Sequence, residues 1–362
     1  MDYLVSASIA FAIAFISLPV VINVFNSLNL LDIPDRRKIH KVSTPSLGGI
    51  PIVSAALLAL LIVMPFSELA NMKFFIAGVI LTFILGIRDD VSSLNARQKL
   101  VIQSLAAFLV VHFLGVYLRS FHGFLGLNEI DPIVGKVLSA MLIVVLTNAY
   151  NLIDGIDGLA GGIAIFILTF LGIWFFYNGA GSYALFAITM ASAILAFMYF
   201  NWFPSKIFMG DTGSMVLGFV LSTLMLQFIE INTRATWMPF ESAVTMSVSL
   251  FILPTYDTLR VFFKRILAGQ SPFSPDKNHV HHVLLKIGFN HGKAASILLS
   301  FMVFICMIAW ALQPLGNNIS MGLIVLITIV FGFGLDFWLG RKVKKQKQRR
   351  LEGDHLMVSK SA

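Results

Sequence analysis

Acidic side chains gather where apolar segments of this 362-residue chain end. They are Asp89 and Asp90 in GIRDD, Asp154 and Asp157 in NLIDGIDGL, Asp211 in MGDTGS, and Asp257 in PTYDTLR. Charge is scarce, at 12% of all residues, and a count of the apolar segments puts these acids on one side of a membrane. Carboxylate oxygens bind hard cations such as Mg²⁺, which in turn hold phosphates. We therefore interpret the cluster as a metal and phosphate site.

The adjacent pair Asp89 and Asp90 follows Arg88 at the end of an apolar segment. Two neighbouring carboxylates repel each other, so a bound cation, Lys99 or Arg97, or a shared proton must offset them. The alternative is a solvated helix end, which is unexpected because a helix C-terminus disfavours acids.

Asp154 and Asp157 are three residues apart in a glycine-rich segment. If this segment is helical, positions i and i+3 share a face. The amides of Asn148 and Asn151 precede the two acids. Amide and carboxylate oxygens together suit Mg²⁺, and they also suit a ribose or uracil edge. The alternative is a helix break with capping acids.

Asp211 and Asp257 occupy different places in their segments. Asp211 opens an apolar segment, where the free N–H groups of a helix start would attract a phosphate, although Asp211 could equally be a simple N-cap. Asp257 lies about one turn inside a span, where an unpaired acid costs at least a few kcal/mol. Arg260, three residues later, offers Asp257 a structural partner, so its role is the least defined.

Basic and imidazole side chains lie in the two long hydrophilic connections. His279, His281 and His282 in SPFSPDKNHVHH accompany no HExxH motif and no cysteine partner. Imidazoles near an acidic magnesium site would bind phosphate oxygens or a leaving group; the alternative is a surface histidine run. His40 and Lys41, before TPSLGG, are interpreted as anion-binding residues or, equally, as a membrane anchor.

Composition indicates the class of protein that must position these groups. The chain is 57% hydrophobic with a mean hydropathy of +0.86, whereas a soluble domain is about 45–50% apolar. A helix needs about 20 apolar residues to cross a membrane. We predict an all-α, polytopic membrane protein without a cleaved signal peptide. Its eleven spans are expected at 3–25, 48–66, 72–88, 99–117, 133–150, 159–177, 183–201, 213–229, 242–260, 294–312 and 319–338.

Basic residues orient this set of spans. With the N-terminus outside, the inner loops hold 14 Lys and Arg residues before the tail and the outer loops hold 4. The C-terminus is then cytoplasmic, and residues 1–340 form one transmembrane domain followed by a basic tail, 341–362. We expect the tail to bind anionic lipid and not nucleic acid, despite the net charge of +8. The single Cys306 excludes a disulfide framework and a cysteine-based metal site.

The motifs together resemble one known family. The pair DD (89–90) and the segments NAYNLIDGIDGLAGG (148–162), MGDTGS (209–214) and SPFSPDKNHVHH (271–282) are similar in order and spacing to those of the polyprenyl-phosphate N-acetylhexosamine-1-phosphate transferases, glycosyltransferase family 4. The resemblance runs from about residue 28 to 293. The HVHH run resembles the bacterial GlcNAc-1-phosphate branch. The branch that transfers phospho-MurNAc-pentapeptide carries a lysine where Ser93 stands here.

The resemblance implies a role for each matching residue. Asn151 and Asp211 would be the metal ligands. Asp89, with Asp90 beside it, would organise the lipid phosphate or act as a base. Donor contacts would come from Lys41, Lys99, Asn148, Asp154, Asp157, His279, His281 and His282. The metal would be Mg²⁺, with Mn²⁺ as a substitute.

The expected reaction transfers GlcNAc-1-phosphate from UDP-GlcNAc to undecaprenyl phosphate and releases UMP, at the cytoplasmic face of a bacterial plasma membrane. A direct attack by the lipid phosphate is favoured over a covalent aspartyl intermediate, because a phosphate is already nucleophilic near pH 7. The sugar, the downstream glycan and a homodimeric state stay open. The alternatives are another UDP-acetamido sugar or the phospho-MurNAc-pentapeptide donor, a cation-coupled transporter and a zinc protease.

Overall fold

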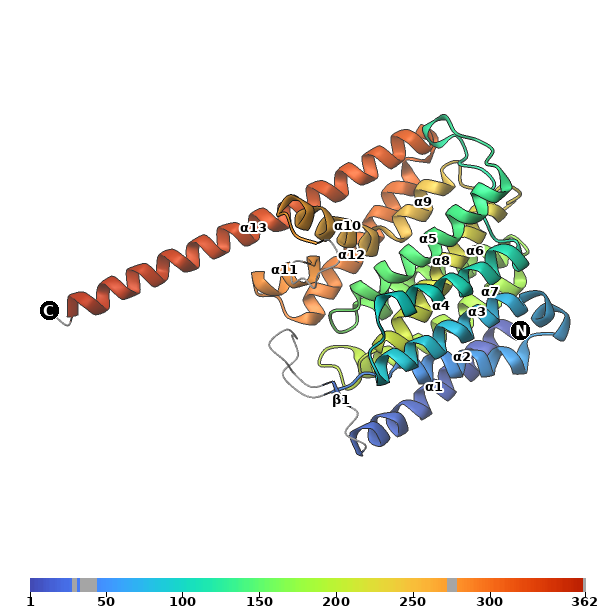
Figure 1. Ribbon diagram of the computed structural model, residues 1–362, viewed down its shortest axis with the longest axis horizontal. Coiled ribbons are helices and arrows are strands. Elements are labelled where there is room, and N and C mark those ends of the chain that lie inside the picture. Colours follow the sequence, from blue (N-terminus) through green and yellow to red (C-terminus); the bar gives the residue numbers. More distant parts are fainter. Residues whose placement is uncertain (28–30, 33–43, 272–278, 361–362) are drawn as a thin grey trace.

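The computed structural model describes the backbone of residues 1–27, 31–32, 44–271 and 279–360, and the side chains of 1–27, 44–271 and 279–344. It is an all-α polytopic membrane protein, as predicted, with long helices running side by side (Figure 1). Two short strands, β1 (Leu31–Asp32) and β2 (Thr44–Pro45), pair in antiparallel fashion.

The helices follow one another along the chain with short connections. They are α1 (Asp2–Ser27), α2 (Gly49–Val63), α3 (Phe66–Val91), α4 (Ala96–Phe108), α5 (Pro132–Ile153), α6 (Leu159–Tyr177), α7 (Gly181–Asn201), α8 (Gly210–Asn232), α9 (Ala243–Leu250), α10 (Ile252–Leu267), α11 (Val280–Ile287), α12 (His291–Ala311) and α13 (Gly316–Lys360). A π-helical turn, Leu109–Leu114, extends α4, and two 3₁₀ turns lie at Phe124–Gly126 and Gln313–Leu315.

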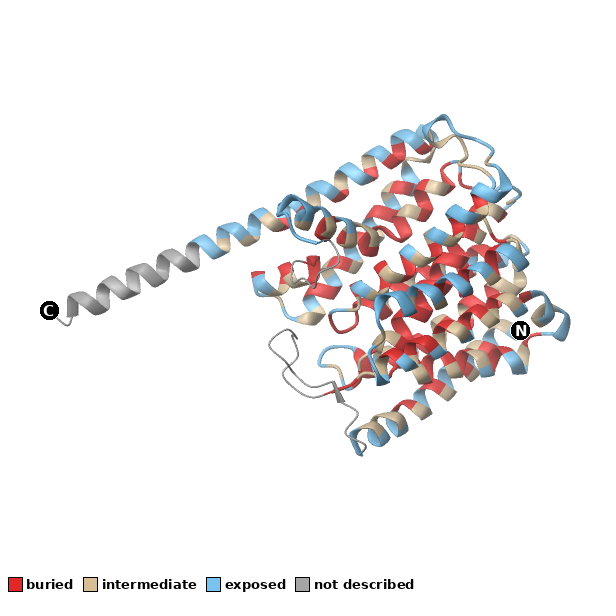
Figure 2. Cartoon of the chain, in the orientation of Figure 1, coloured by how far each residue is buried: buried red, intermediate tan, exposed pale blue. Residues whose placement is uncertain are grey.

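Helix α8 forms the centre of the bundle. It packs against α3 and α5, and 89% of its most apolar stretch is buried, compared with 22% for α1 and for α13. Figure 2 shows the buried residues concentrated in the middle and exposed ones along α1 and α13. Those outer helices expose large apolar side chains such as Leu4, Ile16 and Phe333. Exposed apolar surface of this extent fits contact with lipid.

The described chain contains nine helices that are long and apolar enough to cross a membrane, and the 15-residue α2 is a shorter apolar helix. The span predicted at 242–260 is instead divided into α9 and α10 at Phe251. Pro254 explains the break, because proline has no N–H for the carbonyl of Leu250 and its ring clashes with that carbonyl. The count of eleven spans and their orientation therefore remain predictions.

Two glycines allow α2 and α3 to approach the start of α8. A Cβ at Gly49 would lie 2.2 Å from the backbone nitrogen of Gly213, and a Cβ at Gly86 would lie 2.4 Å from the Cα of Thr212. No residue with a side chain fits such contacts unless the helices move apart. The close crossings place the last turn of α3, with its two acids, beside the first turn of α8.

One end of the bundle collects the helix ends that carry the predicted site. Helices α3, α5 and α7 finish there, and α4, α6, α8 and α12 begin there. The short helix α11 and strand β1 lie at the same end, and α13 extends past it (Figure 1). Arg119 and Arg234, predicted to be outer-loop residues, line a pocket formed by the opposite ends of α7 and α8.

Candidate active site

A cavity of about 530 Å³ opens among these helix ends. It is lined by Ser46, Asp89, Asp90, Ser93, Asn151, Asp154, Gly155, Ile156, Asp157, Asn201, Phe208, Met209, Gly210, Asp211, Ser214, His282 and His291. Six of the side chains predicted from sequence to belong to the site are acids or amides in this lining: Asp89, Asp90, Asn151, Asp154, Asp157 and Asp211. The structure therefore brings together groups that are up to 122 residues apart along the chain.

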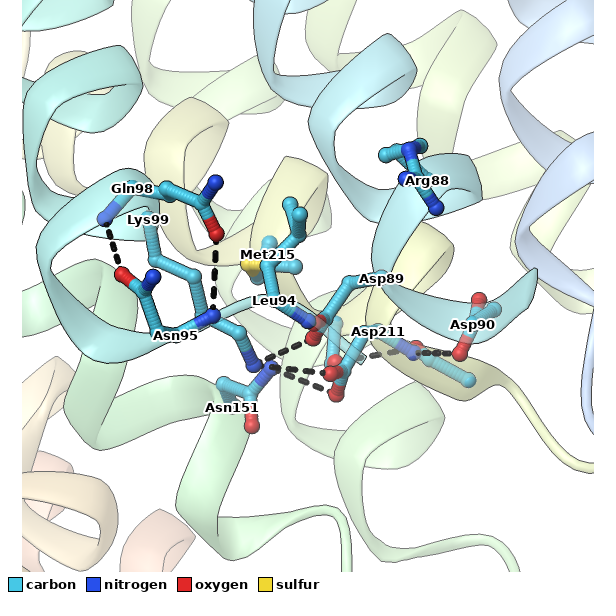
Figure 3. Close-up of polar contacts among 12 residues, drawn as sticks. Arg88, Asp89, Asp90, Leu94, Asn95, Gln98, Lys99, Asn151, Asp211 and Met215 are labelled. Carbon is cyan, nitrogen blue, oxygen red and sulfur yellow. Dashed lines mark hydrogen bonds and ion pairs between the residues drawn. The ribbon is translucent and has the colours of Figure 1, made fainter. Parts of the chain in front are cut away.

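Asp211 lies in the first turn of α8, where its carboxylate receives two side-chain donors. Lys99 Nζ lies 3.2 Å from Asp211 Oδ2, and Asn151 Nδ2 donates to Asp211 Oδ1 at 2.9 Å. Lys99 also forms an ion pair with Asp89. Figure 3 shows these side chains converging from α3, α4, α5 and α8. The N-cap position belongs to Met209 and has no side-chain cap, so Asp211 is not a simple N-cap.

Asp90 holds the start of α8 in place. Its Oδ1 accepts from the backbone N–H of Asp211 at 2.8 Å, and its Oδ2 accepts from the backbone N–H of Thr212 at 2.9 Å and from the Thr212 hydroxyl. Free N–H groups in the first turn of a helix need such acceptors, and a negative charge there is favoured by the helix dipole. Asp90 is thus a side-chain cap provided by a neighbouring helix.

Asp89 has a different set of partners from Asp90. Its Oδ1 accepts from the backbone N–H of Leu94 at 2.7 Å, its side chain pairs with Lys99, and the residue is only 6% exposed. Separate donors thus offset the two adjacent charges, as the sequence required. The alternative of a solvated helix end is wrong.

Asp154 and Asp157 both line the cavity, but not for the predicted reason. Residues 154–158 form a non-helical connection between α5 and α6, so the expected helical face does not exist. Gly158, with a φ of +78°, makes this turn possible. Asp157 is buried, with its Oδ2 3.2 Å from His291 Nδ1 and 3.4 Å from the backbone N–H of Ser205.

The charge in the cavity is reflected in the pKa of Asp154. Burial, and then the negative charges of Asp211, Asp90 and Asp157, raise the pKa of the Asp154 carboxyl to about 7. The ordinary value for an aspartate is about 3.9. Five aspartates line the cavity, and Lys99 pairs with two of them, Asp89 and Asp211. A divalent cation would relieve the remaining negative charge.

The three histidines are not a surface run. His279 and His281 are 8% and 2% exposed, and of the three only His282 is among the side chains that line the cavity. His281 packs so closely on Gly155 that an added Cβ there would lie 2.2 Å from its Nε2. Burial lowers the pKa of the His281 imidazole to about 3, so the ring is neutral near pH 7.

Asn148, another predicted contact, is not among the side chains that line the cavity. Asn148 donates from Nδ2 to Gln103 Oε1 and to the Val144 carbonyl, each at 2.8 Å, one turn below Asn151. The bond to Gln103 joins α5 to α4, so the Asn148 amide has a structural role that needs no substrate. Lys41, together with His40, lies outside the described residues.

Asp257 also lies outside the lining. Its Oδ2 is 2.7 Å from His279 Nδ1, and its Oδ1 accepts from the backbone N–H of Val280 at 2.7 Å. The proposed structural partner, Arg260, instead forms an ion pair with Asp336 of α13. Asp257 is therefore a link between α10 and α11.

Sequence reasoning did not identify His291 and Asn201, which also line the cavity. Asn201 accepts from the N–H of Gly158 and donates to the carbonyl of Ile207, both at 2.9 Å, and so ties the 154–158 connection to the segment before α8. Each residue lies where an apolar span meets the cytoplasmic side in the predicted topology. A search for polar side chains at such span ends would have found both.

The donor groups fit Mg²⁺ better than a transition metal. Within the residues that the structure describes, no three His, Cys, Asp or Glu side chains form a ready cage for a metal ion. Mg²⁺ usually keeps several waters and uses one or two carboxylates plus substrate phosphates. Asp211 supplies such a carboxylate, and the Asn151 amide carries an oxygen acceptor as well as the nitrogen now bonded to Asp211.

Comparison with known proteins agrees with this chemistry. Residues 72–229 match the family model described as glycosyl transferase family 4. The undecaprenyl-phosphate alpha-N-acetylglucosaminyl 1-phosphate transferase of Yersinia pestis is 27% identical over 332 residues, 89% of each chain. The protein of that name from Escherichia coli (strain K12) is 30% identical over 277 residues, 75% of this chain and 73% of the relative.

A relative with a different name gives the same result. The decaprenyl-phosphate N-acetylglucosaminephosphotransferase of Mycolicibacterium smegmatis is 32% identical over 325 residues, 82% of this chain and 79% of the relative. The similarity thus extends over most of the chain in three relatives. The carboxylate cavity, the order of its motifs and these relatives agree that the chain belongs to glycosyl transferase family 4.

Proposed function

We propose that this protein transfers GlcNAc-1-phosphate from UDP-GlcNAc to undecaprenyl phosphate and releases UMP, the first membrane step of a cell-envelope glycan. One observation carries the proposal. Asp89, Asn151 and Asp211 line one cavity, and Lys99 pairs with both acids from beside it. The cavity lies at the end of a bundle whose outer surface is apolar. The relatives act on polyprenyl phosphates, according to their names. Such a cavity admits a soluble nucleotide and a lipid-bound phosphate together.

Asp211 and Asn151 are the residues that would hold Mg²⁺, with Mn²⁺ as a substitute. Bound there, the cation would neutralise the pyrophosphate and polarise the phosphorus that is attacked. Asn151 bonds one oxygen of the Asp211 carboxylate and Lys99 approaches the other, so Lys99 would help to keep this carboxylate oriented. Asp90 fixes the first turn of α8, and thereby the position of Asp211.

The reaction proceeds by attack of an oxygen of the lipid phosphate on the β-phosphorus of UDP-GlcNAc. The new O–P bond forms as the bond between the β-phosphorus and the bridging oxygen breaks, and the bridging oxygen leaves with UMP. Asp89 organises the acceptor phosphate together with Lys99, because it is buried beside that lysine. Catalysis of this kind depends on position and electrostatics more than on covalent chemistry by the protein.

Donor contacts are assigned to the lining residues of the 154–158 connection and of α11. Asp154 and Asp157 face the nucleotide, and His282 reaches the sugar or its phosphate. Lys41 keeps its proposed role as a phosphate contact. His279 and His281 are assigned a supporting role, because both are buried outside the lining.

Release of UMP tests the reaction directly. Purified protein in detergent, supplied with UDP-GlcNAc, undecaprenyl phosphate and Mg²⁺, is expected to form UMP and a lipid-linked sugar diphosphate in equal amounts. EDTA should abolish both products. Absence of UMP with every member of a UDP-acetamido-sugar panel would remove the assignment, and release of UMP with a phospho-MurNAc-pentapeptide donor alone would favour the other branch of the family. The donor that competes best identifies the sugar.

A covalent route is distinguished by leaving out the lipid. With UDP-GlcNAc and Mg²⁺ alone, direct transfer leaves the protein unmodified in intact mass spectra. A phosphosugar adduct on Asp89 or Asp211 would show instead that an aspartyl intermediate forms first.

We further propose the cellular setting. The protein lies in the bacterial plasma membrane with the cavity on the cytoplasmic side, residues 1–340 form the transferase domain, and the basic tail from residue 341 contacts anionic lipid. A transport function is less favoured because the acids lie at helix ends on one side of the bundle, whereas transport sites lie near mid-membrane.

A further inference from the structure

Asp257 is a buried carboxylate that the proposed reaction does not use. It lies on α10, is 1% exposed and is not among the described residues that line the cavity. A buried charge is retained only where strong partners offset its desolvation. Among the described residues, Asp257 bonds to two groups at the start of the neighbouring helix α11: the His279 ring at 2.7 Å and the backbone N–H of Val280 at 2.7 Å.

These two contacts fix the beginning of α11. His279 is the N-cap residue and Val280 the first residue of this helix, and the cap has no side-chain bond of its own. Asp257 therefore supplies from another helix the acceptor that the first turn lacks, with a negative charge at the favourable end of the helix dipole. An eight-residue helix is too short to persist by itself, so its place depends on such external contacts.

The other contacts of α11 that the structure describes are mostly apolar. Val280, Val283, Leu284 and Ile287 are buried and hold the helix by apolar packing, and Lys342 donates to the Ile287 carbonyl at its last turn. Apolar contact is non-directional, whereas two hydrogen bonds to one carboxylate determine both position and rotation at the first turn.

The rotation of α11 matters because the helix carries the histidines toward the cavity. The His279 and His281 rings stack at 5.5 Å with an interplanar angle of 6°, and the His281 and His282 centroids are 4.4 Å apart. His281 packs on Gly155, next to Asp154. His282 then projects into the cavity. A continuous set of contacts thus joins Asp257 to the donor side of the site.

We propose that Asp257 is a positioning residue: by holding His279 and the first turn of α11, it sets His282 in the cavity and supports the 154–158 connection through His281. The proposal rests on the proposed function only where His282 is taken to meet the donor. Asp257 itself contacts neither substrate nor metal.

A double-mutant cycle tests this role. Asp257→Ala is expected to lower kcat/KM for the sugar nucleotide by about 10- to 100-fold, the range seen when partners behind a site residue are removed, with the larger part in KM for the donor. In a His282→Ala background the same substitution should lower kcat/KM by a smaller factor, since coupled residues are non-additive; the loss that remains measures the contribution through His281. If the fold-loss in kcat/KM of the double variant equals the product of the two single losses, the proposal is overturned.

Asp336→Asn is the matched control. It removes the ion pairs of Asp336 with Arg260 and Lys264, which tie the same helix α10 to α13. Helix α13 also contacts the last turn of α11, where Lys342 donates to the Ile287 carbonyl, but neither ion pair of Asp336 involves the first turn of α11. Any loss caused by Asp336→Asn is therefore expected to multiply with that of His282→Ala. If both cycles show the same coupling, Asp257 acts only by stabilising α10, which also contradicts the proposal.

Hydrogen exchange gives a readout that needs no turnover. Asp257→Ala should speed amide exchange across residues 280–287 while α8 and α12 keep their protection. Asp257→Asn, which retains one carbonyl acceptor, should restore part of it. Unchanged exchange in α11 would refute the positioning role even if the protein were inactive. Faster exchange in α11 with no UMP release by the unsubstituted protein would leave Asp257 as the anchor of α11 and refute the proposed reaction alone.

Discussion

Neighbouring carboxylates in the cavity differ in what their oxygens already bind. Both oxygens of Asp90 are occupied by the first turn of α8. In the part of the chain that the structure describes, Asp211 is instead approached by side chains, those of Lys99, Asn151 and Asp89. A backbone-bound carboxylate is not free to take a cation without uncapping a helix. Substitutions of Asp211 and of Asp90 are therefore expected to lower different properties: turnover for Asp211 and stability for Asp90.

Substitution of Asp211 should affect chemistry and not folding. Asp211→Asn keeps the size of the side chain but removes the charge that would hold Mg²⁺, so kcat is expected to fall by about 10²–10³-fold, as for other groups that stabilise transition-state charge. The melting temperature in EDTA should fall by no more than about 2 °C, because an amide at this position still accepts from Asn151 and the cavity loses one of its repelling charges. UMP release at several Mg²⁺ concentrations measures the effect, and undiminished turnover would remove Asp211 from the site.

Substitution of Asp90 should affect folding first. Asp90→Ala leaves two N–H groups of α8 without their acceptor, and loss of a cap costs about 0.5–2 kcal/mol. Asp90→Asn, which retains an acceptor, is the control and should lose less. Thermal unfolding in detergent measures both. Equal stability of the alanine variant and the unsubstituted protein would contradict the capping role.

The raised pKa of Asp154 predicts how stability changes with pH. Between about pH 4, near the value in the unfolded chain, and the folded value of about 7, the folded state holds a proton that the unfolded state has lost. The free energy of unfolding therefore decreases as pH rises through this window. In EDTA, the melting temperature of the unsubstituted protein should fall from pH 5.5 to pH 8 relative to that of Asp154→Asn.

Magnesium should reverse this trend. Because the carboxylates are most negative at high pH, Mg²⁺ is expected to raise the melting temperature more at pH 8 than at pH 5.5. His281 acts in the opposite sense, since a lowered histidine pKa destabilises the fold as pH falls below about 6.5; the comparison with Asp154→Asn removes that contribution. Parallel pH profiles for the two proteins would show that Asp154 is not the titrating group.

At the scale of helices, the site depends on how closely α3 and α8 cross. Gly86→Ala would place a Cβ 2.4 Å from the backbone of Thr212, so the helices must separate just beside Asp89 and Asp211. Overpacking of this kind costs about 1–3 kcal/mol, and kcat should fall together with the melting temperature. Gly322→Ala in α13 is the control, because nothing lies within 4 Å of its Cβ and alanine favours a helix. Equal melting temperatures for both variants would show that the crossing can relax.

The helix ends could be predicted from sequence, but the connections between them could not. Apolar spans have a length set by the membrane, and this property alone puts Asp89, Asn151 and Asp211 at one end. The non-helical turn at 154–158 was missed because the spacing of the two acids fits a helix equally well. The burial of His279 depends on contacts between α10 and α11, and a local sequence pattern does not predict such contacts.

The break at Phe251 could be predicted only in part. Pro254 is visible in the sequence, and a proline inside an apolar run predicts a helix boundary, yet run length favoured one span. The shorter α10 that results is what allows Asp257 to meet α11. Contacts between helices therefore determine the role of Asp257, for which the sequence offered only Arg260 as a partner.

At the scale of the whole molecule, the cavity and the loop around Leu125 lie at opposite ends of the bundle, and the basic residues predict which end faces the cytoplasm. Leu125 is 73% exposed, Ser92 is exposed near the cavity, and the single Cys306 is buried. In intact cells, a membrane-impermeant maleimide should label Leu125→Cys and not Ser92→Cys, and in inverted vesicles the pattern should reverse. Labelling of Ser92→Cys in intact cells would place the cavity outside, where a cytosolic nucleotide could not reach Asp211, and the proposed reaction would then lack its donor.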